Sequence, residues 1–168
     1  MDGFRAFWDG SKLYSKSGQT FSVPLEFTRS FPNDVCLDGE LWVGYNQFPK
    51  LSSILKRSNQ IAHNSYDLWK DVRFCVFDAP LYPGHYLERH SYVTKLMDNH
   101  TSNPNIFVIP IVSCSGLDHL QSILEQIKQK TGEGVMLYDP KSEYTSGRTN
   151  HVLKVKTFSE EDVKFVGQ

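Results

Sequence analysis

Hydrophobic and polar positions change period several times along this chain. Residues 3–8 and 12–15 form two short strand-like runs on either side of Asp9-Gly10-Ser11, which predicts a β-hairpin closed by a tight turn. A strand of mixed character follows over 38–44. Apolar residues then recur at helical spacing over 48–57. The first third of the chain therefore predicts three strands followed by a helix.

The middle of the chain contains the most apolar short run. Residues 72–78 have the length of a strand and end before Pro80, which cannot donate to a β-ladder, so we expect a buried central strand. Helical spacing returns over 83–100 and 117–130, and a strand is expected between them at 106–112.

The last third predicts strands at 134–138, 152–156 and near 163–166, with a polar loop over 139–150. Strands and helices are mixed without regular alternation, which is typical of an α+β fold. A length of 168 residues matches one domain.

Charge and cysteine content narrow the possible partners. Eighteen basic and nineteen acidic side chains give a net charge of −1, so any contact with phosphate must be local. The three cysteines fit neither a disulfide framework nor paired metal ligands, and Cys36 and Cys75 are expected to be buried. No stretch is long and apolar enough to span a membrane. We expect an intracellular protein with no membrane partner, in the nucleus if the organism is eukaryotic.

Six short segments combine carboxylates beside glycines with isolated cations or aromatic residues. Each is a weak signal alone, and their order carries the information. In chain order they are Asp2-Gly3-Phe4-Arg5, Ser15-Lys16-Ser17-Gly18, Leu37-Asp38-Gly39-Glu40-Leu41, Phe74-Cys75-Val76-Phe77-Asp78, Gly132-Glu133-Gly134-Val135-Met136 and Leu153-Lys154-Val155-Lys156.

This series resembles the ordered motifs of ATP-dependent DNA ligases, most closely the small viral and bacterial ones. The resemblance implies the nucleotidyltransferase core that ligases share with mRNA-capping enzymes, an ATP-grasp-like fold of two packed, mostly antiparallel sheets with flanking helices. It spans residues 1–168 as one adenylation domain that is incomplete at its N-terminus. We expect no counterpart in this sequence of the oligonucleotide-binding (OB-fold) domain that follows in the family.

The nucleophile implied by the resemblance lies outside the chain. The family motif is Lys-x-Asp-Gly-x-Arg, and Met1 occupies the position of x. The lysine that attacks ATP would stand immediately before Met1, so this chain is not expected to complete the first step. Two explanations stay open, a truncated chain and a natural protein that has lost its nucleophile.

The resemblance assigns the α-phosphate to Lys154 and Lys156. Alternate positions on one strand place both ammonium groups on the same face, where they would stabilise negative charge during displacement. The alternative is a solvated strand face. Glu40 is assigned to the ribose or to a metal-bound water, and Glu133 to Mg²⁺, which prefers oxygen ligands. Ordinary ion pairing is the alternative for both carboxylates.

Other roles follow from the same motifs. Phe77 is expected against the adenine ring, or else as a core residue. Asp2 and Arg5 are expected at the nucleotide. Lys16 stands where the family usually has arginine and is expected at phosphate, although a lysine in a turn is usually a surface residue. Arg148 is expected on the DNA backbone.

The implied function is the sealing of nicks in duplex DNA with ATP and Mg²⁺, through lysyl-AMP and DNA-adenylate intermediates, as in replication, repair and recombination. DNA binding by this chain alone is expected to be weak. Two alternatives stay open, namely a pseudo-enzyme that binds nucleotide or DNA ends, and a relative of RNA ligases or capping guanylyltransferases. Phosphate-binding loops of the P-loop type, nucleophile elbows and paired zinc-ligand histidines are absent from the sequence.

Overall fold

The computed structural model describes residues 1–59, 66–100 and 103–156. It begins with the expected hairpin, in which β1 (Phe4–Trp8) pairs antiparallel with β2 (Leu13–Ser15). The carboxylate of Asp9 accepts hydrogen bonds from the backbone N–H groups of Ser11 and Lys12, at 2.8 and 2.7 Å. Asp9-Gly10 closes the hairpin because the acidic side chain accepts hydrogen bonds from the backbone N–H groups of the turn.

The hairpin is part of a five-stranded sheet with the order β2-β1-β3-β4-β5. Its other strands are β3 (Leu37–Trp42), β4 (Arg73–Asp78) and β5 (Ile106–Val108), and only the β4–β5 pair is parallel. The strand predicted over 106–112 is therefore shorter than expected. The Ile109 N–H still bonds to the Val76 carbonyl, but Pro110 has no N–H with which to continue the ladder.

Three longer helices confirm the predicted ones. They are α2 (Phe48–Ser58), α4 (Tyr86–His100) and α5 (Leu117–Gln129). Two single-turn helices, α1 (Leu25–Thr28) and α3 (Tyr66–Trp69), were not predicted, because one turn is too short to show a periodic pattern. They place Phe27 and Trp69 in the interior, where the two rings lie 4.9 Å apart.

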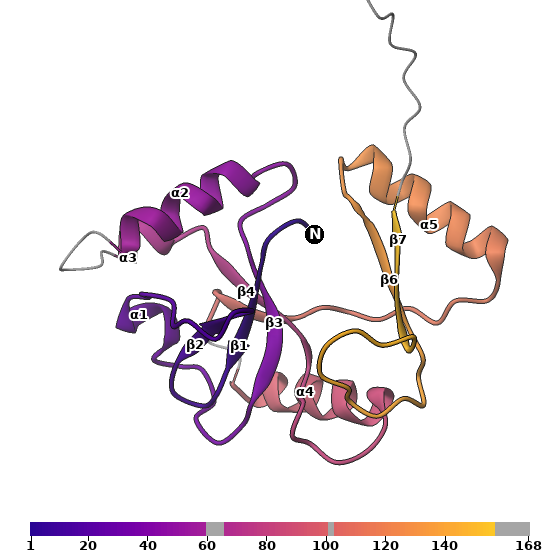
Figure 1. Cartoon of the computed structure of the whole chain (residues 1–168), viewed down its shortest axis with the longest axis horizontal. Helices are drawn as coiled ribbons and strands as arrows, with labels where there is room; N and C mark the ends of the chain where they lie inside the picture. The colour runs from indigo at the N-terminus through magenta and orange to yellow at the C-terminus, as the bar shows by residue number, and fades with distance from the viewer. Residues whose placement is uncertain (60–65, 101–102, 157–168) are drawn as a thin grey trace, which may run out of the picture.

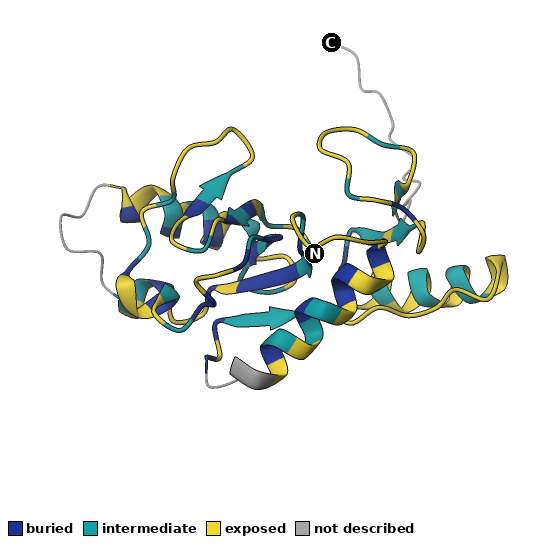
Figure 2. Ribbon diagram, turned by 90° about the horizontal axis from the view of Figure 1, so that it is seen from below, coloured by how far each residue is buried: buried dark blue, intermediate teal, exposed yellow. Residues whose placement is uncertain are grey.

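The core lies between the five-stranded sheet and helices α1 to α4, and α4 contributes Val93 and Met97 (Figure 1). Phe31 stacks on Phe74 of β4 with ring centres 5.8 Å apart, and the Trp69 indole donates to Ser58 Oγ at 2.7 Å. Figure 2 shows the buried residues concentrated in the part of the molecule that contains the five-stranded sheet and its helices. Cys75 is buried as predicted, whereas Cys36 is only partly buried, which corrects the expectation for that thiol.

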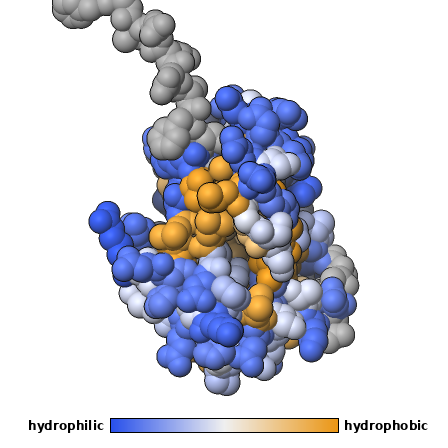
Figure 3. All heavy atoms as spheres, turned by 90° about the vertical axis from the view of Figure 1, so that its right-hand side faces the viewer, coloured by the Kyte–Doolittle hydropathy of each residue, from blue (hydrophilic) through white to orange (hydrophobic). Residues whose placement is uncertain are grey.

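A smaller sheet pairs β6 (Gly134–Tyr138) antiparallel with β7 (Val152–Lys156). Helix α5 packs against β6, and none of its residues is fully buried. Figure 3 shows an apolar area on the side of the molecule where these elements lie. The exposed apolar side chains of this part of the chain include Ile111, Val112, Leu117 and Leu153. One helix on a two-stranded sheet thus leaves apolar surface uncovered.

The two sheets are connected through the start of α4. Tyr86 stacks on Tyr138 of β6 at 4.1 Å, and its N–H donates to the Ser142 carbonyl at 2.9 Å. These features confirm the predicted α+β fold of two mostly antiparallel sheets with flanking helices. The strand predicted near 163–166 lies outside the described residues. In the described part of the chain, no helix combines the length and the apolar character that crossing a membrane requires.

Candidate functional site

The face of the five-stranded sheet opposite the core carries the charged residues. Side chains alternate between faces along a strand, and β1 and β3 pair so that Arg5 lies opposite Glu40. The register between β3 and β4 shifts between Asp38 and Gly39. Phe77 is the extra residue of β4 at this irregularity. Such bulges redirect a side chain next to a site, here from a strand that is otherwise buried.

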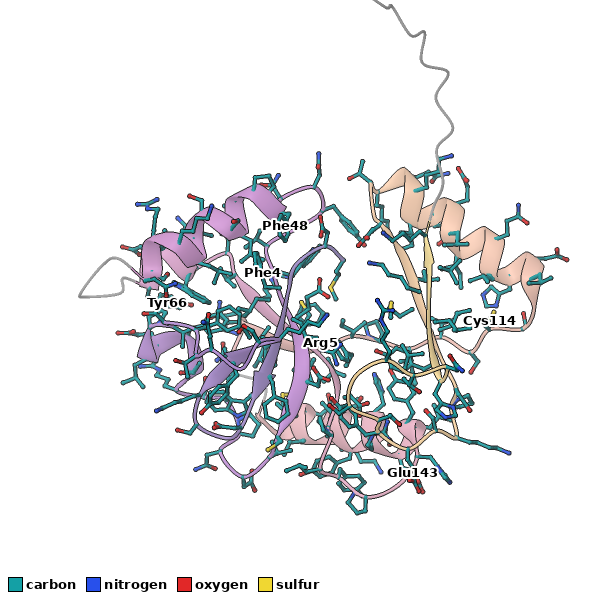
Figure 4. The ribbon with its side chains drawn as sticks, in the orientation of Figure 1. Phe4, Arg5, Phe48, Tyr66, Cys114 and Glu143 are labelled. Atoms are coloured by element: carbon teal, nitrogen blue, oxygen red, sulfur yellow. The ribbon has the colours of Figure 1, made fainter. Side chains whose placement is uncertain are left out.

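Arg5 is held by a carboxylate and lies beside an aromatic ring. Its Nε donates to Asp38 Oδ1 at 2.7 Å, its Nη2 donates to Asp38 Oδ2, and its guanidinium carbon lies 5.0 Å from the centre of the Phe77 ring. Burial alone would lower the pKa of Arg5, but the hydrogen bonds and charge of Asp38 outweigh it and raise that pKa. Figure 4 shows Arg5 on the opposite side of the sheet from Phe4 and Phe48. Arg5 is therefore an oriented, permanently charged group.

Asp38 also receives a third hydrogen bond from a distant part of the chain. The Tyr144 hydroxyl donates to Asp38 Oδ2 at 2.9 Å from the loop between β6 and β7. Burial, together with the charge of Asp38, raises the pKa of Tyr144 to about 12. Sequence reasoning gave no separate role to either residue. The one available signal was an acidic residue inside the apolar run of β3, since a buried carboxylate needs a partner.

Glu40 lies two residues after Asp38 and is partly buried. Burial raises the pKa of Glu40 above its ordinary value, and the charges of the N-terminal amine and then of Lys154 act in the opposite direction. Glu40 lies on β3 and Lys154 on β7, so this electrostatic effect acts between residues of different sheets.

As predicted, the ammonium groups of Lys154 and Lys156 lie on the same face of β7, and both pair with Glu133. The ammonium groups of Lys154 and Lys156 lie 2.7 and 3.1 Å from the same oxygen, Glu133 Oε1. The hydrogen bond from Lys154, aided by Lys156, lowers the pKa of Glu133. The second oxygen, Oε2, accepts no hydrogen bond from a described residue. No cluster of three or more His, Cys, Asp or Glu side chains suited to a metal ion occurs among residues 1–59, 66–100 and 103–156.

Two glycines that follow an aspartate, Gly3 and Gly39, are required by close backbone approach. A Cβ on Gly3 would lie 2.1 Å from the Leu41 carbonyl oxygen and 2.8 Å from Glu40 Oε1. A Cβ on Gly39 would lie 2.6 Å from the Cys75 carbonyl oxygen. Neither backbone carbonyl can move aside without disturbing the sheet, so glycine is a structural requirement at positions 3 and 39.

Three further predicted residues are exposed to solvent. Asp2 is exposed just before β1, and its negative charge acts on Glu40. Lys16 is exposed in the turn after β2, and Arg148 is exposed in the loop between β6 and β7. Neither cation forms an ion pair with another residue in the described part of the chain.

A family model described as "ATP dependent DNA ligase domain" matches residues 1–156. A DNA ligase from Haemophilus influenzae is 31% identical over 159 residues, which are 94% of this chain and 56% of that protein.

Solved structures of DNA ligases are also similar to this chain. A structure from a study of DNA binding with a minimal scaffold in Lig E DNA ligases is 32% identical, with a TM-score of 0.81, and the match covers 94% of this chain and 59% of that one. The Chlorella virus DNA ligase-adenylate shares the fold at 19% identity, with a TM-score of 0.71 over 92% of this chain and 59% of the viral chain. The chain thus spans somewhat more than half the length of these similar proteins.

Proposed function

The chain belongs to the ATP-dependent DNA ligase domain family, and on this basis we propose that it binds ATP and forms the adenylation domain of a ligase that seals nicks in duplex DNA. The complete reaction is part of the proposal, because the chain spans only 56% of the length of its Haemophilus relative. Its steps are transfer of AMP from ATP to a lysine with release of pyrophosphate, transfer of that AMP to a 5′-phosphate, and attack by the 3′-hydroxyl with release of AMP. Replication, repair and recombination all produce such nicks.

One observation carries the proposal. Phe77 and Arg5 form an aromatic and cationic surface on the five-stranded sheet, and the small sheet carries a pair of lysines, of which Lys154 acts through its charge on Glu40. A purine base stacks well on a ring and a guanidinium. Two ammonium groups on one strand face suit the charge that develops on a phosphate during displacement. This arrangement supports a nucleotide between the sheets.

The carboxylates fit a magnesium ion. Mg²⁺ usually binds through one or two carboxylates together with waters and substrate phosphates, and Glu133 Oε2 has no hydrogen-bond donor among the described residues. Glu133, with Glu40 as the second carboxylate, would hold the ion. The ion would supply additional positive charge at the phosphates.

The nucleophile is proposed at the position immediately before Met1, as the family motif requires. A lysine amine attacks only when it is partly deprotonated, which desolvation and nearby cations favour. Lys154 and Lys156 are the nearby cations proposed for this role. Arg148 is proposed to contact the DNA backbone, and Lys16 a phosphate.

The test compares two versions of the chain, one with lysine and one with alanine placed immediately before Met1. Each is incubated with α-labelled ATP and Mg²⁺ and analysed by denaturing electrophoresis. We expect a covalent AMP adduct with lysine and none with alanine or with the sequence that starts at Met1. If the lysine version binds ATP but forms no adduct, the proposed chemistry is wrong and a nucleotide-binding protein without catalysis is favoured.

A further inference from the structure

We propose that Tyr144 is a positioning residue that holds Arg5 beside Phe77 through Asp38. The loop between β6 and β7 would then control the geometry of the nucleotide-binding face from the other sheet. This inference rests on the proposed function only for the identity of the ligand at Arg5. The hydrogen-bonded chain from Tyr144 to Arg5 is a property of the free protein.

Asp38 is the group that links the two residues. Its side chain is 2% exposed and accepts three hydrogen bonds, two from the fork of Arg5 and one from Tyr144. A buried carboxylate is costly unless its oxygens are satisfied. Arg5, whose side chain is 51% exposed, is held on the protein side by this carboxylate. The orientation of the carboxylate therefore sets the plane of the guanidinium.

Tyr144 can act only as a donor in this contact. With its pKa raised to about 12, its hydroxyl keeps its proton across the neutral range, and a charged carboxylate can only accept. Tyr144 is therefore able to donate this hydrogen bond throughout the neutral range. It satisfies the same oxygen, Oδ2, that receives Arg5 Nη2.

The position of Tyr144 is fixed by contacts of its own loop. Two residues earlier, the Ser142 carbonyl accepts from Arg89 Nη1 at 3.0 Å and from the Tyr86 N–H at 2.9 Å. The guanidinium carbon of Arg89 also lies 5.8 Å from the centre of the Tyr144 ring. Tyr144 is thus supported by α4 independently of Asp38, as a residue that positions another must be.

Tyr144 shares its loop with a second residue for which a role is proposed. Arg148, the proposed DNA contact, stands four residues after Tyr144 in the same loop. One segment therefore carries both the group proposed for the DNA backbone and the group that holds Arg5.

The first test needs no nucleotide. Phenylglyoxal modifies accessible arginines, and the rate at Arg5 is compared by peptide mapping with the rate at exposed Arg57 on α2. In Tyr144→Phe we expect Arg5 to react about 3- to 10-fold faster, which corresponds to losing one hydrogen bond. The matched control is Tyr92→Phe, because Tyr92 is also partly buried, stacks on Tyr82 and donates no hydrogen bond to a described residue. An unchanged Arg5 rate in Tyr144→Phe overturns the proposal.

The second test measures AMP binding by calorimetry. Tyr144→Phe should weaken binding about 3- to 10-fold, with a thermal midpoint like that of Tyr92→Phe. Because Tyr144 acts through Arg5, adding Tyr144→Phe to Arg5→Ala should cause no further loss. Additive losses in the double variant also overturn the proposal. If the unmodified chain binds no AMP, the proposed function fails, and the modification rates still decide the role of Tyr144.

Discussion

Three cations that lie on strands are proposed to contact the nucleotide, and each already has a carboxylate partner. The strength of these ion pairs differs. Exposed ion pairs contribute about 0 to 1 kcal/mol, and the side chains of Lys154 and Lys156 are each about half exposed. A phosphate group can therefore replace Glu133 as their partner at small cost. Asp38 is buried, and leaving a buried carboxylate without its partner costs about 3 to 5 kcal/mol. Arg5 thus stays with Asp38 while the lysines exchange partners.

Replacing Glu133 tests this exchange together with the metal role. In the version with lysine before Met1, Glu133→Ala should slow adenylation about 10²-fold, which is typical of removing a group that stabilises charge at a metal or oxyanion site. The rate is measured in single turnovers at saturating ATP and Mg²⁺. Glu125→Ala, an exposed carboxylate on α5, is the control and should have the normal rate. A near-normal rate for Glu133→Ala would contradict the metal role.

The pKa shift of Glu133 limits the pH range in which this comparison is valid. The lysines lower its pKa below the ordinary value of 4.5. A lowered carboxyl pKa means that the ion pairs are complete above about pH 4.5 and are lost only as the pH falls through the lower folded-state value. Measurements between pH 6 and 8 therefore compare a charged Glu133 with alanine.

At the scale of elements, the spacing of hydrophobic residues predicted the longer helices and strands. It predicted the hairpin, the buried β4 and the three longer helices, because each contains enough positions to show its period. It failed for α1 and α3, each of four residues, and it extended β5 past Pro110. It also placed Lys154 and Lys156 on one face. The contact of Tyr144 with Asp38 joins residues 106 positions apart, and such a pairing leaves no periodic trace in a sequence.

The start of α4 connects both sheets through one buried side chain. Arg89, 3% exposed, donates to both oxygens of Asp78 on β4, at 2.7 and 3.0 Å, and to the Gly84 and Ser142 carbonyls. We expect Arg89→Ala to lower the free energy of unfolding by about 3 to 5 kcal/mol, because Asp78 would stay buried without its partner. Urea denaturation measures the change.

Two further variants identify the cause of this loss. Arg57→Ala on the exposed face of α2 should change the free energy of unfolding by less than about 0.5 kcal/mol. Adding Asp78→Ala to Arg89→Ala should recover part of the stability, since it removes the unpaired charge. A loss below about 1 kcal/mol in Arg89→Ala would show that the buried pair does not connect the sheets as the contacts indicate.

At the scale of the whole molecule, the charge balance predicts a low affinity for the DNA partner proposed above. The net charge is −1, so no general field attracts a polyanion. Of the five cations proposed for phosphate, Arg5, Lys154 and Lys156 are paired with carboxylates of the same chain. Lys16 and Arg148 have no such partner within the described ranges, and they are exposed.

Binding to nicked duplex DNA should therefore be weak and only slightly dependent on salt. Each phosphate contact contributes roughly 0.9 to the slope of log affinity against log salt, so two available cations predict a slope of about −2, against about −4.5 for all five. Lys16→Ala and Arg148→Ala should each make the slope shallower by about 0.9. Lys56→Ala on α2 should leave it unchanged. Fluorescence anisotropy over a salt series measures these slopes. A slope near −4.5 would show that DNA displaces Asp38 and Glu133 from their partners, and tight binding that is insensitive to salt would place the DNA surface elsewhere on the molecule.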